Sequence, residues 1–171
     1  MIADALHEFD DDVVLVGHSI GGLTIPLVAH ARPVRKLIFL AGVFPLIGTS
    51  FNSQKQLEPD MVLPHPGGPR AARERFYSEA SDSDAAWSES QLCPQSQTPY
   101  SEITPLAEWP DVDMVSVIPT ADRTVNPVWQ RKAAEERFGL QPVELLGADH
   151  SPFLTRPAEL ARLLVSLSEN E

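Results

Sequence analysis

The sequence predicts an α/β fold, in which a parallel sheet of about four strands is flanked by helices and carries a small, mainly helical cap. Short apolar runs alternate along the chain with stretches of helical periodicity, as right-handed crossovers onto a parallel sheet require. The run over 34–42 is apolar almost without interruption, which is typical of a strand covered on both faces. The 171 residues suffice for one domain with a hydrophobic core.

The first elements lead to a serine. Apolar residues at helical spacing over 1–9 predict the end of an amphipathic helix, and the β-branched run that follows predicts a strand over 13–17. We expect a helix from Gly21 to Ala31, with Pro26 in its first turns, where a missing N–H does least harm. Strand and helix are therefore joined by a very short turn.

That turn has the spacing G-x-S-x-G, with Ser19 between Gly17 and Gly21. In a sharp strand-to-helix turn the serine backbone is strained, side chains at the flanking positions would clash, and the hydroxyl is exposed as a nucleophile. The start of the helix offers N–H groups to a developing oxyanion. The plainer alternative is that Ser19 only caps the helix and the glycines only form the turn.

The second strand, Val34 to Gly42, is followed by a stretch of different composition. Over 43–108 the residues Pro, Ser, Gln and Gly dominate, and only the segments near 70–80 and 83–92 have helical character. Aromatic side chains in this stretch supply apolar surface to bury. We therefore interpret 43–108 as a cap inserted over the sheet rather than a linker.

The remaining elements alternate again. A strand is expected over 113–118, a helix over about 128–138 that ends at Gly139, and a strand over 142–146. The last helix, roughly 157–168, repeats leucine at helical spacing, at Leu160, Leu163, Leu164 and Leu167.

Three polar residues follow three of these strands: Ser19, Asp122 and His150. The carboxyl ends of parallel strands meet at one edge of a sheet, where ligands bind. Together the three side chains have the chemistry of nucleophilic catalysis, in which the imidazole takes the hydroxyl proton and the carboxylate orients the imidazole. Taken singly, Asp122 can be interpreted as a turn or cap residue without a catalytic role, and His150 can be interpreted as a residue of a surface loop.

Other candidates have lesser roles. Asp149 is expected to be a solvated charge, because adjacent residues rarely face each other. We expect His18 to pack or hydrogen-bond under the serine turn, and we place Phe44 and Phe153 near the substrate pocket. The aromatic residues of 43–109 are otherwise assigned to the core of the cap. The remaining histidines are assigned to the surface: His7, His30 and His65.

Charge and cysteine usage exclude several classes of function. The net charge of −11 argues against binding to nucleic acid or to anionic membranes. Cys93 is the only cysteine, so neither an internal disulfide nor a cysteine cluster for a metal is expected. Acidic residues stand where a signal peptide needs basic ones, and no apolar run reaches transmembrane length, so we expect a cytoplasmic protein.

Several motifs together carry a resemblance: the segment 14–22 with its Gly-His-Ser-Ile-Gly-Gly turn, Asp122 five positions before Pro127, the segment 147–150, and Pro157 at the last helix. They resemble the C-terminal part of the α/β-hydrolase fold, most closely the esterases grouped with plant methylesterases and hydroxynitrile lyases and their bacterial relatives.

The resemblance implies roles for residues. Ser19 would be the nucleophile, Asp122 the triad acid, His150 the base and the Ile20 N–H an oxyanion donor, without a cofactor. Lyase members of the family have a lysine after the histidine. Ser151 stands there in this chain, which favours ester hydrolysis over cyanohydrin cleavage.

The family's sheet has further strands before the serine turn, and with them the loop that supplies a second oxyanion N–H. This chain shows none of them, so strand 13–17 is expected to be an unpaired apolar edge. Three explanations stay open: the natural chain is longer, a second copy covers the edge in a homodimer, or the protein is a poorly active remnant.

The sequence thus predicts a serine hydrolase that cleaves small carboxylic esters through an acyl-enzyme on Ser19. Thioester or lactone cleavage would use the same residues. The alternative from another class is a weakly active or inactive hydrolase-like fragment that serves as a binding or dimerisation module.

Overall fold

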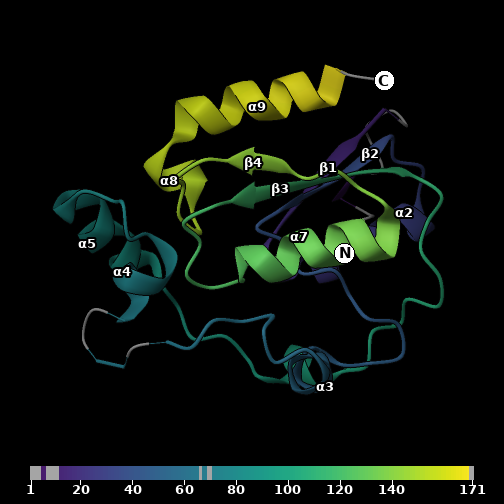
Figure 1. Cartoon of the computed structure of the whole chain (residues 1–171), viewed down its shortest axis with the longest axis horizontal. Helices are drawn as coiled ribbons and strands as arrows, with labels where there is room; N and C mark the ends of the chain where they lie inside the picture. The colour runs from purple at the N-terminus through teal and green to yellow at the C-terminus, as the bar shows by residue number, and fades with distance from the viewer. Residues whose placement is uncertain (1–4, 7–11, 66, 69–70, 170–171) are drawn as a thin grey trace.

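The sheet has four parallel strands in the order β1-β2-β3-β4 (Figure 1). The computed structural model describes residues 5–6, 12–65, 67–68 and 71–169. Its strands are β1 (Val14–His18), β2 (Lys36–Leu40), β3 (Asp113–Pro119) and β4 (Val143–Leu145). The predicted parallel α/β architecture is confirmed. The helix expected over 1–9 lies, apart from Ala5 and Leu6, outside the described residues.

The register aligns the carboxyl ends of the strands. His18 at the end of β1 pairs with Leu40, and Leu40 pairs in turn with Val117 of β3. Pro119, the last residue of β3, pairs with Leu145, the last residue of β4. The loops that follow the strands therefore leave the sheet at one edge.

The central strand β2 is buried along its whole length, as its apolar sequence predicts. Its side chains alternate between two cores. Leu37 and Phe39 pack on the side of α2 (Ile25–Ala31) and α7 (Pro127–Phe138), whereas Ile38 and Leu40 face α9 (Pro157–Glu169). Figure 1 shows α7 and α9 on opposite faces of the sheet. Leucines at helical spacing line the sheet-facing side of α9: Leu160, Leu163, Leu164 and Leu167.

The helix after the serine turn begins later than predicted. A short 3₁₀ helix, η1, spans Ser19–Leu23, and the α-helix α2 starts only at Ile25. Pro26 explains the difference, because it has no N–H to donate to the preceding turn and so is tolerated only at the start of an α-helix. The later helix α7 follows the prediction closely, with the Asn126 side chain capping its start and Gly139 ending it in a left-handed conformation.

The described residues between β2 and β3 form four helices: α3 (Phe51–Leu57), α4 (Ala71–Phe76), α5 (Asp82–Gln91) and α6 (Thr98–Ser101). The sequence indicated α4 and α5 but not α3 and α6. Figure 1 shows α4 and α5 beyond the carboxyl ends of β3 and β4, near α8 (Pro152–Thr155). The Thr124 hydroxyl donates to the Arg75 carbonyl, which ties α4 to the loop after β3.

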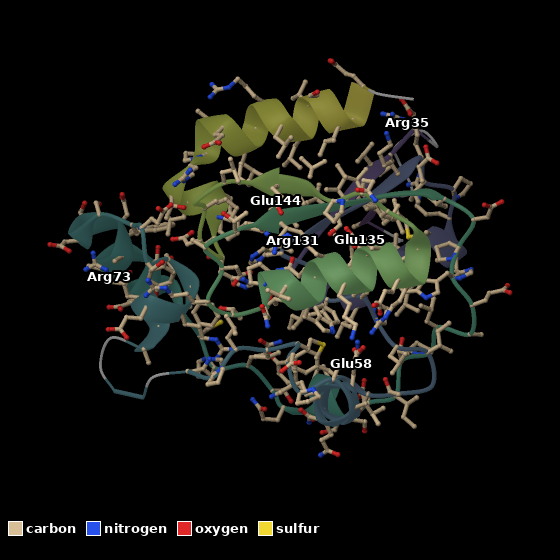
Figure 2. The ribbon with its side chains drawn as sticks, viewed as in Figure 1. Arg35, Glu58, Arg73, Arg131, Glu135 and Glu144 are labelled. Atoms are coloured by element: carbon tan, nitrogen blue, oxygen red, sulfur yellow. The ribbon has the colours of Figure 1, made fainter. Side chains whose placement is uncertain are left out.

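Ion pairs on the surface connect neighbouring elements (Figure 2). Arg131 of α7 pairs with Glu144 of β4, and Arg73 of α4 pairs with Asp82 of α5. Exposed pairs of this kind add little to stability. Within the described residues, no helix is long and apolar enough to cross a membrane.

In the described part of the chain, β1 is at an edge of the sheet, with only β2 beside it. Val16 on this strand is 43% exposed, although its neighbours Leu15 and Gly17 are buried. A homodimer through this strand stays a prediction.

Candidate active site

The serine turn has the predicted backbone strain. Ser19 has a φ of 54°, in the left-handed region that few residues other than glycine adopt. A Cβ at position 17 would lie 2.9 Å from the Ile25 Cδ1 and 3.0 Å from the backbone of Gly21, so a side chain there would force Ile25 and the turn to shift. A Cβ at Gly21 would meet nothing within 4 Å, and the expectation of a clash there was wrong. The second tight position is Gly22, where a Cβ would lie 2.4 Å from the Val43 carbonyl oxygen.

The structure brings His150 and Asp122 into contact. His150 Nδ1 lies 2.8 Å from Asp122 Oδ2, and both side chains are almost completely buried. A carboxylate can only accept, so the proton of a neutral imidazole sits on Nδ1 and leaves Nε2 free as a base. The other carboxylate oxygen, Oδ1, accepts from the backbone N–H groups of Thr124 and Val125. Asp122 is therefore held in place by the loop after β3.

Ser19 reaches the same region from the end of β1. Ser19, Ile20 and His150 all line one cavity of about 680 Å³. Among the described residues, the Ser19 hydroxyl forms no hydrogen bond, with His150 or with any other side chain. Contacts between nucleophile and base are commonly long without substrate and tighten when it binds.

His18 lies beside this group rather than in it. Its Nε2 donates to the backbone carbonyl of His150 at 2.7 Å, and its ring packs edge-on against Phe153, with the centroids 5.0 Å apart. Burial, together with the nearby His150 ring, lowers the pKa of His18 to about 4. His18 is therefore neutral near pH 7, where it supports the loop that carries His150 and forms part of the cavity wall.

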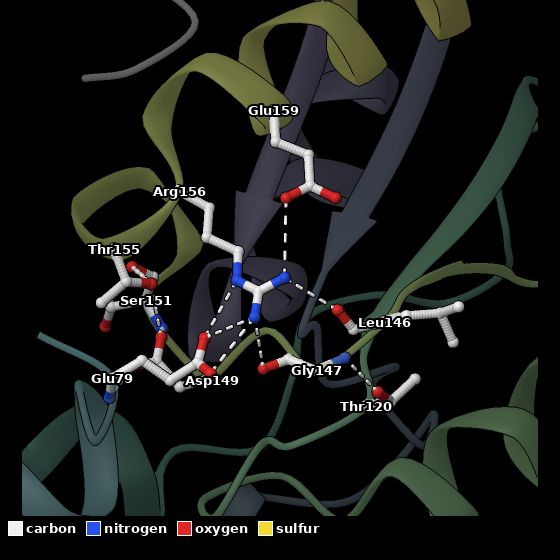
Figure 3. Close-up of polar contacts among 9 residues, drawn as sticks. All are labelled: Glu79, Thr120, Leu146, Gly147, Asp149, Ser151, Thr155, Arg156 and Glu159. Carbon is white, nitrogen blue, oxygen red and sulfur yellow. Dashed lines mark hydrogen bonds and ion pairs between the residues drawn. The ribbon is translucent and has the colours of Figure 1, made fainter.

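Asp149 is buried, not solvated as predicted (Figure 3). Its Oδ1 accepts from the Ser151 N–H and the Thr155 hydroxyl, and its Oδ2 accepts from the backbone N–H of Glu79. None of these partners is Ser19, Asp122 or His150. The carboxylate instead fastens the segment between α4 and α5 to the loop that carries His150.

Arg156 strengthens the same connection (Figure 3). Its guanidinium pairs with Glu79 and also donates to the carbonyl oxygens of Leu146 and Gly147, at 2.9 and 3.0 Å. Gly147 has a φ of +70°, a conformation that favours glycine. The segment before α5 and the loop after β4 are therefore joined by both backbone and side-chain contacts.

Apolar side chains form most of the cavity wall. Phe153 is among them, as predicted, and is half exposed. Phe44 is not, which corrects the prediction: it is completely buried, and its ring packs against Phe39 and Phe138. The chain turns at this point, so that Val43 faces the cavity. The segment between β2 and β3 supplies lining residues that the sequence did not single out: Phe51, Val62, Arg75, Phe76, Tyr77, Trp87, Leu92 and Tyr100.

Sequence patterns could hardly have found these residues. The aromatic content of 43–109 was visible, but hydrophobic spacing does not tell a cap core from a cavity wall. One of these rings comes close to the candidate base from a distant part of the chain: the Phe76 ring lies 5.8 Å from the His150 ring, centroid to centroid. In the part of the chain that the structure describes, no group of three or more His, Cys, Asp or Glu side chains is placed to hold a metal ion.

Comparison with known proteins agrees with the α/β fold. The model of the alpha/beta hydrolase family matches residues 2–163. The chain belongs to this family. Among curated members, it is 26% identical to the probable esterase PIR7A of Oryza sativa subsp. indica. The alignment is 184 residues long and covers 91% of this chain and 70% of that protein. It is 24% identical to salicylic acid-binding protein 2 of Nicotiana tabacum, over 186 residues covering 93% of this chain and 71% of that protein.

Solved structures of other proteins also superpose on this chain. Polyneuridine aldehyde esterase superposes with a TM-score of 0.78 at 18% identity, covering 98% of this chain and 77% of its own. The methylesterase MES16 from Arabidopsis superposes with a TM-score of 0.75 at 22% identity, covering 98% of this chain and 75% of its own. At these identities the likeness shows the α/β-hydrolase fold. The curated relatives include esterases, which supports the assignment of this chain as an esterase-type hydrolase.

Proposed function

We propose that this α/β hydrolase cleaves carboxylic esters through an acyl-enzyme on Ser19. The observation that carries the proposal is the buried contact between His150 Nδ1 and Asp122 Oδ2, in a cavity that the strained Ser19 also lines. Buried polar groups need partners, and here the pairing leaves a basic imidazole nitrogen facing the site.

The proposed reaction has two halves. In the first, His150 Nε2 takes the proton of the Ser19 hydroxyl as its oxygen attacks the ester carbonyl, and the Ile20 N–H stabilises the oxyanion. The imidazolium returns that proton to the departing alcohol, which leaves the acyl group on Ser19. In the second half, His150 takes a proton from water as the water oxygen attacks the acyl-enzyme. The imidazolium then returns this proton to the Ser19 oxygen as the acyl bond breaks and the acid is released. Asp122 stabilises the imidazolium in both halves.

The cavity indicates the kind of ester. A volume of about 680 Å³ lies within the usual range for sites that hold drug-sized ligands. The wall is mostly apolar, so that the proposed substrate class extends from short acyl esters to esters with a bulky apolar group.

The test is covalent labelling together with turnover. A fluorophosphonate probe is expected to label wild type on Ser19, to leave Ser19→Ala unlabelled, and to label Ser83→Ala, which lacks an exposed serine of α5, as it labels wild type. p-Nitrophenyl acetate should be hydrolysed by wild type and at background rate by His150→Ala. Equal background rates in both proteins would refute the proposal and would fit a binding module without catalysis.

A further inference from the structure

The lining of the cavity contains one residue of permanent charge. Arg75, near the end of α4, lies in the wall together with Phe76 and Thr124. Among the described lining residues no aspartate or glutamate accompanies it. In a chain with a net charge of −11, an isolated cation in the cavity that holds the candidate nucleophile is unexpected.

The guanidinium of Arg75 is also poorly satisfied. Its Nε is buried and donates to no acceptor among the residues that the structure describes, and the side chain forms no ion pair with them. The guanidinium lies over the face of the Phe76 ring, with 4.7 Å from guanidinium carbon to ring centroid. A buried donor without an acceptor destabilises the folded protein, and more so when the group is charged. Sites that bind a complementary group often leave such a donor open.

Position links Arg75 to the reacting centre. The Phe76 ring contacts the guanidinium and also lies 5.8 Å from the His150 ring, centroid to centroid. One aromatic ring therefore neighbours both the guanidinium and the imidazole of the candidate base. A substrate with its carbonyl at Ser19 could place a second group against Arg75 without leaving the cavity.

Burial lowers the pKa of Arg75, whereas the field of Asp122 raises it. The guanidinium nevertheless stays charged at any pH at which the protein is folded. The free-energy cost of burying the Arg75 guanidinium falls when an anion binds to it, because a carboxylate can accept two parallel N–H bonds from a guanidinium.

We propose that Arg75 binds a carboxylate carried by the substrate, so that the preferred substrates are esters with a free carboxylate at the end remote from the scissile bond. This proposal rests on the proposed esterase function and names the substrate class of the same site. Half-esters of dicarboxylic acids, with an apolar chain between the two groups, fit both the apolar wall and the single cation.

Matched substrate pairs test this directly. Monomethyl azelate is compared with the same methyl ester in which the remote carboxylate is a carboxamide, and 8-acetoxyoctanoate is compared with its carboxamide. Each pair keeps size and leaving group and removes only the charge. For wild type we expect a kcat/KM roughly 10- to 100-fold higher for the carboxylate in at least one pair, as expected for a hydrogen bond to a charged group.

Variants test whether Arg75 causes the preference for carboxylate esters. Arg75→Gln should abolish it by raising KM for the carboxylate ester, with kcat and the rates for the carboxamide esters within a few-fold of wild type, because the contact is remote from the reacting atoms. Arg75→Lys should restore part of it. Arg123→Gln removes a nearby exposed charge and should keep the wild-type preference. A purely structural role for Arg75 would instead lower kcat for all four esters alike.

A binding measurement does not depend on turnover. In Ser19→Ala, azelate should raise the melting temperature more than the neutral azelamide, and Arg75→Gln in that background should remove the difference. If wild type hydrolyses both members of each pair equally and azelate binds no better than azelamide, the carboxylate proposal is wrong while the esterase proposal stands. If Ser19→Ala hydrolyses the esters as wild type does, the esterase proposal itself fails.

Discussion

Two adjacent glycines of the serine turn should respond in opposite ways to the same substitution. At Gly22, an alanine Cβ would lie 2.4 Å from the Val43 carbonyl oxygen and 3.0 Å from the Val43 nitrogen. Both are backbone atoms, and the Val43 N–H donates to the Ser19 carbonyl at 3.0 Å. The turn must therefore move. At Gly21, an added Cβ meets nothing within 4 Å and the backbone φ is not positive.

The magnitudes follow from these contacts. Overpacking costs about 1–3 kcal/mol, and a weakened hydrogen bond adds about 0.5–1.5 kcal/mol, so Gly22→Ala should lose roughly 2–4 kcal/mol of unfolding free energy. Gly21→Ala should be neutral or gain up to about 1 kcal/mol, because alanine costs less backbone entropy in a helical turn. In a domain of this size the two melting temperatures should differ by roughly 5–15 °C.

The assay is urea unfolding and thermal melting of both variants beside wild type, with ester hydrolysis as a second measurement. Gly22→Ala should also lose activity, because Val43 lines the cavity and holds the serine turn. The G-x-S-x-G spacing names Gly21 rather than Gly22. If Gly21→Ala proves as destabilised as Gly22→Ala, the steric reasoning is refuted and the motif glycine is the required one.

Three further changes test the site. Asp122→Asn removes the acceptor that sets the tautomer of His150, so kcat should fall roughly 10²–10⁴-fold while the fold is kept, as circular dichroism would check. His18 has a pKa of about 4 in the folded protein, against the ordinary histidine value of 6.5, so the unfolded chain binds an extra proton between these values. Stability should therefore be full above pH 6.5 and fall by about 3 kcal/mol toward pH 4. Urea unfolding of His18→Gln should show a shallower pH slope over that window, and an unchanged slope would contradict the assignment. Asp149→Ala breaks three hydrogen bonds to a buried carboxylate and should lose about 2–4 kcal/mol, whereas Glu159→Ala, which loses one exposed ion pair, should stay within about 0.5 kcal/mol.

Local patterns were sufficient for the scaffold. The nearly continuous apolar run of β2 required cover on two faces, and the leucine spacing of α9 required a sheet to pack on, so the parallel α/β arrangement could be predicted. Ser19, Asp122 and His150 could be placed at one edge for the same reason, since strand ends are visible in the sequence and parallel strands end together. These features depend on the neighbours of each residue in the chain.

Only the tertiary structure determines which residues line the cavity. Phe44 and Phe76 look alike in the sequence, yet one packs in the core and the other lies in the cavity beside His150. Asp149 reads as a surface charge until Glu79, seventy positions earlier, supplies its N–H. Arg75 is one of several arginines until folding places it in the cavity wall beside the Phe76 ring. Periodicity records which side of an element is buried; it does not record what a loop from elsewhere in the chain brings against that side.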